Sequence, residues 1–357
     1  MLALLFIIIS LGAVFEIASL RRDVNKVEFD YTISTSLTEP GVPFNVQLAV
    51  TNESRLPISY LVIWEVFPMA AELPEGITYQ MKNDGLYVKN ISRVRGRQRK
   101  KLIFETSIKK RGVHLFIGDS IEFGDFLGFR EITKKFSQRR EVVVYPERIE
   151  CQELTDALGN FCGDIAAKRF LIRDPILTIG CREYTGREPL KEIHWLQSAH
   201  RGTLMVREFD YNRQLSACVI LSVDGIDSAG ESELDECCST ARTVCETLAA
   251  SGVSVNFFTN ANLWRKYEKT IWKCTVSQNH TEGLLEGLGR VSSYACCSLE
   301  KLQEYALREN TSDTAFIIIL PAGEKRGEEL SNQLRRKTGQ EVLLLQTGQT
   351  AREEEIA

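Results

Sequence analysis

The stretch QLSACVILSVDG, residues 214–225, decides the fold of the second half of the chain. An apolar run rich in β-branched residues that ends in an Asp–Gly turn is typical of a strand buried on both faces of a sheet. Similar runs come after it, separated by segments with helical periodicity. The strands are expected at 214–225, 253–260, 270–277, 314–323 and 341–348, and the helices at 232–251, 281–288, 298–307 and 325–338. This alternation predicts a von Willebrand A-like (Rossmann-type) α/β domain over residues 213–350.

Residues 24–148 have a different pattern. VEFDYTIST at 27–35 and PFNVQLAVTNES at 43–54 alternate apolar and polar residues, and ISYLVIWEVFP at 58–68 is an apolar run between prolines. Short strands separated by Gly, Pro and Asn turns predict an immunoglobulin-like β-sandwich. Arginines alternate over residues 93–99, which indicates either a solvated edge strand or a contact for acidic lipid headgroups.

The first residues are strongly apolar. LALLFIIISLGAVFEIASL at 2–20 contains one charge, Glu16, and is followed by Arg21 and Arg22. Nineteen residues of helix can cross the hydrocarbon core of a bilayer, and basic residues after the span favour a cytoplasmic location for the rest of the chain. We therefore expect a single-pass transmembrane helix in the inner, cytoplasmic membrane of a cell; a buried helix is the alternative. The whole chain is then an α+β multidomain protein: helix, sandwich and α/β domain.

Composition excludes several classes of function. With 44 Lys and Arg against 48 Asp and Glu, the formal net charge of −4 does not indicate a nucleic-acid partner. Ten cysteines occur without a CxxC pair, which favours reduced, buried thiols over a zinc site or disulfide framework. The adjacent pairs at 237–238 and 296–297 leave redox activity open. No GxGxxG, P-loop or GxSxG motif is present, so nucleotide and serine-hydrolase functions lack support.

A degenerate metal site comes after the first strand of the expected α/β domain. Ligands of such sheets bind at the carboxyl ends of the strands. Asp224 and Ser228 occupy the first and last positions of the Asp-x-Ser-x-Ser motif that presents oxygens to Mg²⁺ in metal-ion-dependent adhesion sites, but Ile226 replaces the middle hydroxyl. We therefore expect no cofactor and no catalytic residue. Asp224 and Ser228 are the candidates if Mg²⁺ does bind.

The segment 149–212 joins the two domains and contains CREYTGREPLKEIHWLQSAHRGTLMVREFD at 181–210. Pro189 favours the first turn of a helix that runs to about Ala199. Its apolar residues, Trp195 among them, are expected to be buried. The charges of both signs can pair in a network that fixes the segment against the sheet, or the segment can dock a partner. His194 as a general base is a third interpretation, although no nucleophile is evident near it.

The same segment resembles the signature of the bacterial domain of unknown function 58 family. The positions that carry the resemblance, and the expected docking or structural motif, are Arg182, Tyr184, Gly186, Ile193, His194, Trp195, Ser198, Arg207 and Glu208. The sequence departs from the family where Glu188 stands for Asp and where Lys191 and His200 stand for Arg. The resemblance extends over most of the chain, including KKRGVHLFIGD at 109–119 and EVVVYPE at 141–147.

The resemblance implies a cellular role but no catalysed reaction. Members of that family are often encoded beside MoxR-type AAA+ ATPases and other membrane proteins, and their von Willebrand A-like domain often lacks a working metal site. We expect a membrane-anchored, non-enzymatic interaction or adaptor protein that works with a MoxR-type AAA+ ATPase in the assembly or maturation of envelope proteins. Its expected partners are the lipid bilayer, that ATPase and other membrane proteins. The alternative is a Mg²⁺-dependent ligand-binding protein.

Overall fold

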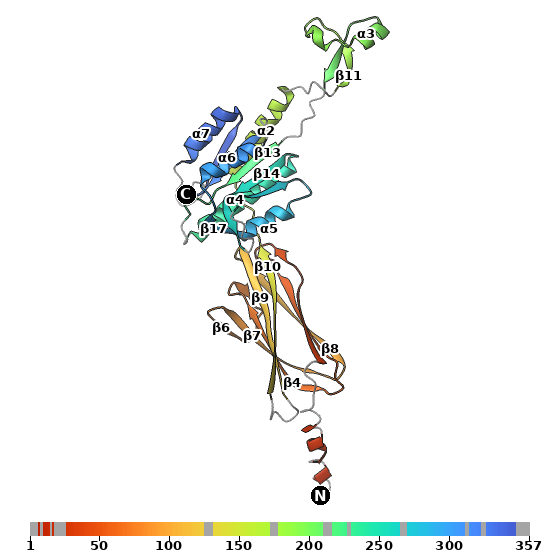
Figure 1. Cartoon of the computed structure of the whole chain (residues 1–357), viewed down its shortest axis with the longest axis vertical. Helices are drawn as coiled ribbons and strands as arrows, with labels where there is room; N and C mark the ends of the chain where they lie inside the picture. Colours follow the sequence, from red (N-terminus) through yellow and green to blue (C-terminus); the bar gives the residue numbers. More distant parts are fainter. Residues whose placement is uncertain are drawn as a thin grey trace. The chain divides into compact units, whose positions relative to one another are not determined.

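The structure of the protein is a computed structural model. It describes residues 6–7, 10–14, 16–17, 26–124, 131–171, 178–209, 216–226, 230–264, 270–310, 314–322 and 326–347. The chain divides into two compact units, residues 1–147 and 148–357 (Figure 1). The boundary expected from the sequence lies between residues 148 and 149.

The first unit contains two sheets. One has the strand order β1-β3-β8-β5, and the other has the order β2-β10-β9-β4-β7-β6. The strands are β1 (Val27–Ile33), β2 (Leu37–Thr38), β3 (Phe44–Asn52), β4 (Ile58–Phe67), β5 (Ala71–Glu72), β6 (Tyr79–Lys82), β7 (Gly85–Val94), β8 (Gln98–Ile108), β9 (Gly112–Gly124) and β10 (Glu131–Val144). Neighbouring strands are antiparallel except β2 and β10, which are parallel.

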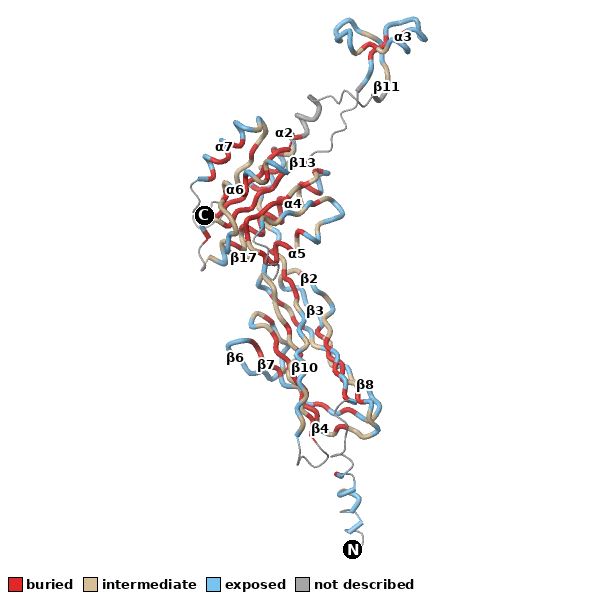
Figure 2. The backbone as a smooth tube through the Cα atoms, viewed as in Figure 1, coloured by how far each residue is buried: buried red, intermediate tan, exposed pale blue. Residues whose placement is uncertain are grey.

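Alternation along the strands builds the core between these sheets. On β1 the side chains of Val27, Phe29 and Tyr31 are buried, whereas Glu28 and Asp30 are exposed. The strand predicted at 27–35 is therefore confirmed, and its apolar face points inward because successive side chains leave a strand on opposite faces. Figure 2 shows the buried positions along the strands of this unit in red.

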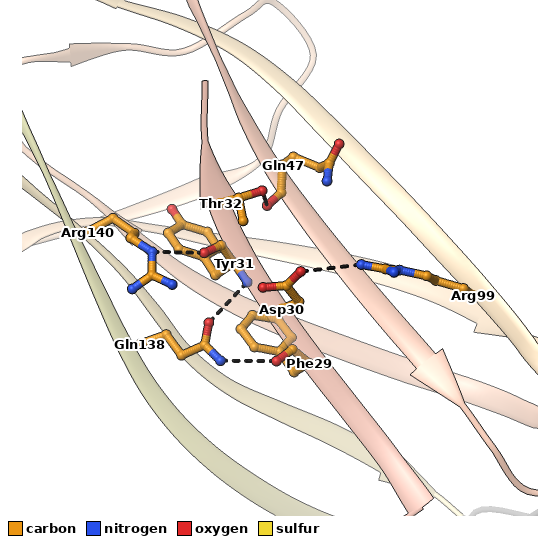
Figure 3. Close-up of polar contacts among 8 residues, drawn as sticks. All are labelled: Phe29, Asp30, Tyr31, Thr32, Gln47, Arg99, Gln138 and Arg140. Carbon is orange, nitrogen blue, oxygen red and sulfur yellow. Dashed lines mark hydrogen bonds and ion pairs between the residues drawn. The ribbon is translucent and has the colours of Figure 1, made fainter. Parts of the chain in front are cut away.

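The free edge of β1 is covered by side chains of β10. The Gln138 amide accepts a hydrogen bond from the Tyr31 amide N–H (3.0 Å) and donates one to the Phe29 carbonyl (3.0 Å). The Arg140 Nε donates to the Tyr31 carbonyl (3.1 Å), as Figure 3 shows. A bulge between Lys135 and Gln138 precedes these contacts. Since an unpaired strand edge invites pairing with another chain, these side chains protect the sheet.

The second unit contains a five-stranded sheet with the order β16-β14-β13-β18-β19. Its strands are β13 (Ser216–Leu221), β14 (Ser254–Thr259), β16 (Trp272–Val276), β18 (Ala315–Leu320) and β19 (Val342–Gln346). All neighbours are parallel except the edge strand β16, which is antiparallel to β14. A separate two-stranded sheet pairs β15 (Ala261–Leu263) with β17 (Val291–Ala295).

Helices cover both faces of the five-stranded sheet. They are α2 (Gln152–Leu171), α4 (Glu231–Ala250), α5 (Glu282–Arg290), α6 (Leu299–Glu309) and α7 (Gly327–Thr338). Val219 and Leu221 of β13 belong to an apolar cluster with residues of α2, α4 and α5, whereas Cys218 and Ile220 belong to a second cluster with residues of α6 and α7. Strand residues buried on both faces explain the unbroken apolar run ACVIL.

The predicted transmembrane helix is not supported. Within the described part of the chain, no helix is long and apolar enough to cross a membrane. Helical residues occur at 6–7, 10–14 and 16–17, and the rest of the expected span 2–20 lies outside the described residues. The prediction used the hydropathy of residues 2–20 and the basic residues that follow them, whereas a span needs a continuous apolar helix of about twenty residues. The single-pass membrane localisation is withdrawn with it.

The predicted fold class is also wrong as a description of the whole chain. Among the residues that the structure describes, 44% are in strands, which form several sheets, and 30% are in helices. The long strands β9 and β10, of 13 and 14 residues, contribute much to the larger share of strand residues. The hydropathy of residues 2–20 predicted a helical anchor. The two-stranded sheets were not predicted, because short strands leave little periodic signal.

Candidate protein-docking module

The segment singled out by the sequence forms a small unit of local structure, residues 178–209, which we call the hairpin module. It contains β11 (Thr178–Glu183), a 3-10 turn at Leu190–Glu192, α3 (Trp195–Arg201) and β12 (Met205–Phe209). β11 and β12 pair in antiparallel register, with Cys181 opposite Arg207. The loop between the two strands carries the turn and the short helix.

The helix predicted from Pro189 to about Ala199 is interrupted. Ile193 is extended and forms an isolated antiparallel bridge with Val206. α3 then begins at Trp195 and ends at Arg201, and it is followed by Gly202, whose φ of 71° is readily adopted by glycine. A pairing between residues thirteen positions apart therefore replaces one turn of the expected helix.

A small core holds the hairpin module together. Ile193, Met205 and Val206 are buried. The Ser198 hydroxyl accepts a hydrogen bond from the Met205 amide (2.8 Å) and donates one to the His194 carbonyl (3.0 Å). Ser198 therefore connects α3 to β12, which is a structural role for one of the predicted motif residues.

His194 also has a structural role. Its Nδ1 accepts a hydrogen bond from the Gln197 amide (3.2 Å) and so caps the N-terminus of α3, while its own amide donates to the Met205 carbonyl (2.8 Å). Ser198 bonds to the backbone of His194 and not to its ring. The geometry of a nucleophile beside a general base is therefore absent from this pair.

Glu188 organises the loop that follows β11. Its carboxylate accepts hydrogen bonds from the Thr185 amide (3.1 Å) and hydroxyl (2.9 Å) and pairs with the Arg182 guanidinium (2.6 Å). Burial by itself raises the pKa of the Glu188 carboxyl, but these donors outweigh burial and lower the pKa to about 2. Gly186, with φ of 89°, provides the turn. Tyr184 is half-buried, and its amide donates to the Leu204 carbonyl.

Arg182–Glu188 is the pair of the predicted charge network that the described residues show. Arg207 and Glu208 on β12 are exposed. Arg187, Arg201 and Arg207 have no carboxylate partner among the residues that the structure describes. The sequence showed enough opposite charges to pair, but pairing requires the side chains to meet, which sequence spacing alone does not establish.

Four large apolar side chains of the hairpin module are exposed. The exposed fractions are 68% for Leu190, 67% for Trp195, 70% for Leu196 and 45% for Leu204. Burial was expected from their hydropathy, and that expectation was wrong for these side chains. Aliphatic and indole side chains gathered on so small a unit are typical of a surface that another molecule covers.

The degenerate metal motif is used differently from the prediction. Asp224 Oδ2 accepts a hydrogen bond from the Leu299 amide (2.8 Å) at the N-terminus of α6, and the Asp224 amide donates to the Ser222 hydroxyl (3.2 Å). Ser228 lies outside the described residues. Among those that are described, no group of three or more His, Cys, Asp or Glu residues could hold a metal ion. The expectation concerning Mg²⁺ stays a prediction.

The thiols and one buried carboxyl complete the candidate sites. All ten cysteines are free. Burial raises the pKa of Cys237 to about 12 and that of Cys297 to about 11, so neither favours the reactive thiolate.

Glu65 of β4, which is 0% exposed, was not predicted from the sequence. Its signal was a lone acidic residue inside the apolar run ISYLVIWEVFP.

Comparison with known proteins gives distant similarities. No family model matches the chain. It is 21% identical over 269 residues to the uncharacterized protein YeaD of Bacillus subtilis (strain 168), a match that covers 75% of this chain and 63% of the relative, so the chain spans less than two thirds of that relative's length. The resemblance to the domain of unknown function 58 family therefore stays a prediction.

Similar solved structures match one third of the chain. One is a cohesin module from a family 33 glycoside hydrolase of Clostridium perfringens (TM-score 0.27, 10% identity, 33% of this chain and 96% of that chain). Another is the CARDB domain of the PF1109 protein of Pyrococcus furiosus (TM-score 0.22, 12% identity). That match covers 33% of this chain and 90% of that chain.

The von Willebrand A-like assignment of the second unit is corrected. The comparisons provide no evidence for a von Willebrand A-like domain. The assignment relied on the alternation of strands and helices, and Asp224 of the expected metal motif accepts a hydrogen bond from the amide at the start of α6. The second unit is therefore described by its own sheet topology.

Proposed function

We propose that this protein is a non-enzymatic interaction protein and that its hairpin module binds a partner protein. The observation that carries the proposal is the exposure of Leu190, Trp195, Leu196 and Leu204. Apolar surface in contact with water is unfavourable, and a partner that covers it recovers that free energy. Trp is among the residues that contribute most at protein interfaces, so Trp195 is the expected anchor of the contact.

Exposed basic residues of the hairpin module suit a partner with an acidic surface. Arg187, Lys191 and Arg201 are exposed, and none of them has a carboxylate partner in the described ranges. Complementary charge at the rim of an interface speeds association and selects the partner. Following the family resemblance, we propose a MoxR-type AAA+ ATPase as the partner and the assembly or maturation of envelope proteins as the process.

The non-enzymatic part of the proposal is supported by how the candidate groups are used. His194 caps α3, Ser198 bonds to the backbone, and Asp224 holds the start of α6. A catalytic group needs a free acceptor or nucleophile directed at a substrate. Each of these three side chains instead has a hydrogen bond that stabilises the fold.

The test uses the full chain and a purified MoxR-type ATPase. We expect Trp195→Ala and Leu196→Glu each to weaken binding by at least about tenfold, because they remove or charge the proposed contact. Tyr294→Glu is the matched control, since Tyr294 is an exposed apolar residue of the same unit that lies outside the hairpin module. Binding would be measured by calorimetry or surface plasmon resonance.

Equal affinity of the wild type and both module variants would contradict the proposed docking surface. Absence of binding by the wild type would contradict the proposed partner. Circular dichroism of each variant confirms that the fold is retained.

A further inference from the structure

Glu65 is a carboxyl group buried in the core of the first unit. Glu65 alternates along β4 with Leu61, Ile63 and Phe67, so that these residues are two positions apart. Leu61, Ile63 and Phe67 belong to the apolar core cluster of the unit. Residues two apart on a strand share a face, so Glu65 points between the two sheets. Its side chain is 0% exposed.

Neither oxygen of Glu65 has a hydrogen-bond partner in the described part of the chain. The paired positions on the neighbouring strands are Val88 of β7 and Gly118 of β9, which offer no polar side chain. An ionised carboxylate buried without donors is very unfavourable, whereas the neutral acid is tolerated. The geometry therefore favours the neutral form while the sheets are closed.

Tyr31 faces this carboxyl from the opposite sheet. Its hydroxyl is buried and also has no hydrogen-bond partner among the described residues, and the charge of Glu65 acts on it. A Cβ added at Gly118 would lie 2.8 Å from Cε1 of Phe29 and 3.2 Å from Cγ of Tyr31, so the rings of β1 occupy the space that a side chain would need there. Gly118 thus allows β1 to pack closely beside Glu65.

Burial is the cause that raises the pKa of Glu65 to about 8. Arg140 of β10 donates its Nε–H to the backbone carbonyl of Tyr31, and burial is the cause that acts on Glu65. β7 adds two more buried polar atoms without partners in the described ranges, Nδ2 of Asn90 and Oγ of Ser92, opposite Ile63 and Leu61. Neither of these titrates. Tyr31 is therefore the titratable group opposed to Glu65.

We propose that Glu65 is a proton-sensitive element of the first unit. The neutral carboxyl allows β1 and β4 to pack together, and its ionisation, with release of the proton to bulk water, weakens that packing. A protein that carries such a group responds to a mildly alkaline environment by loosening one sheet against the other. This inference concerns residues 27–67 and is independent of the hairpin module.

The sign of the effect is set by the pKa. The folded state binds the Glu65 proton up to about pH 8, whereas an ordinary glutamate releases it near 4.5. The folded state therefore holds more protons than the unfolded state between these values, and stability falls as the pH rises through this window. The loss is complete above the folded-state pKa.

The test is hydrogen exchange of the full-length chain at about pH 6 and about pH 9, with rates corrected for base catalysis. We expect β1 and β4 of the wild type to exchange at least about tenfold faster at the higher pH, and Glu65→Gln to show no such increase, because its amide does not ionise. Glu105→Gln on β8 is the matched control, since Glu105 is exposed and the variant should behave as the wild type.

An equal increase in the wild type and Glu65→Gln, or no increase in the wild type, overturns the proposal. If Glu65→Gln does not fold, a titration of the wild-type protein followed by NMR tests the proposal instead. The ¹³C signals of its labelled glutamate carboxyls should then include one that titrates above about pH 7. If no glutamate titrates above about pH 7, the proposal is wrong.

Discussion

Glu188 illustrates how a single residue can organise a loop. Its carboxylate receives donors from Thr185, Arg187 and Arg182, all within six residues of it. Because the donors are local, the ionised form is stabilised as soon as the loop closes. Glu65 is the opposite case, since its surroundings are assembled from strands distant in sequence and provide no donor among the described residues.

The stability of the hairpin module should depend on acid through Glu188. The pKa of this carboxyl lies near 2 when folded and near 4.5 ordinarily, so the stabilisation is complete above about pH 4.5 and disappears as the pH falls towards 2. The amide chemical shifts of Thr185 and Arg187, followed by NMR over this range, should reveal the transition.

Glu188→Gln should remove that acid transition and loosen the loop at neutral pH, because an amide oxygen is a poorer acceptor from Arg182 than a carboxylate. Glu208→Gln on the exposed face of β12 is the control. Identical titration curves for Glu188→Gln and the wild type would contradict this assignment.

At the scale of elements, β1 is held on both edges, by pairing with β3 on one and by side chains of β10 on the other. One edge of β1 is paired with β3, and the other receives Gln138, Arg140 and Lys134. Figure 3 shows Gln138 reaching the backbone of two β1 residues. Side-chain donors and acceptors take the place of a further strand at this edge.

We expect Gln138→Ala to destabilise the first unit by about 1–3 kcal/mol, because two backbone groups of β1 lose their partners. Urea denaturation measures the change, and hydrogen exchange at the Tyr31 amide should accelerate. Gln80→Ala on the fully exposed strand β6 is the control and should have little effect. If exchange at Tyr31 is unchanged, the edge is protected by something else.

At the scale of the whole molecule, the two units have separate apolar cores. Phe116 lies in the core of the first unit, where its ring packs edge to face against the rings of Phe44 and Phe67. The ring centroids are 5.7 Å and 5.4 Å apart, respectively. Leu288 of α5 lies in a core of the second unit. Units with separate cores are expected to unfold as separate cooperative transitions.

Phe116→Ala should therefore shift one calorimetric transition, by about 3–5 kcal/mol of unfolding free energy, and leave the other in place. Leu288→Ala should shift the second transition by about 2–5 kcal/mol and leave the first. A single transition that moves with either substitution would show that the units unfold together.

The sequence by itself determined the strands with a clear apolar pattern. Alternation predicted the strand found at Val27–Ile33, and the unbroken apolar run predicted the strand found at Ser216–Leu221. Both patterns are local, because the side chains of a strand must match the environment on each of its faces. Hydropathy alone did not establish a membrane span, and a degenerate motif did not establish a metal site.

Tertiary structure decided which distant residues meet. Gln138 bonds to Tyr31, 107 residues away, and the Asp224 carboxylate bonds to the Leu299 amide, 75 residues away. Ile193 pairs with Val206 in place of continuing a helix. It also decided that Trp195 is exposed while Glu65 is buried, against the hydropathy of both. The physical reason is that burial and pairing depend on the surface that a distant segment presents, which local periodicity does not encode.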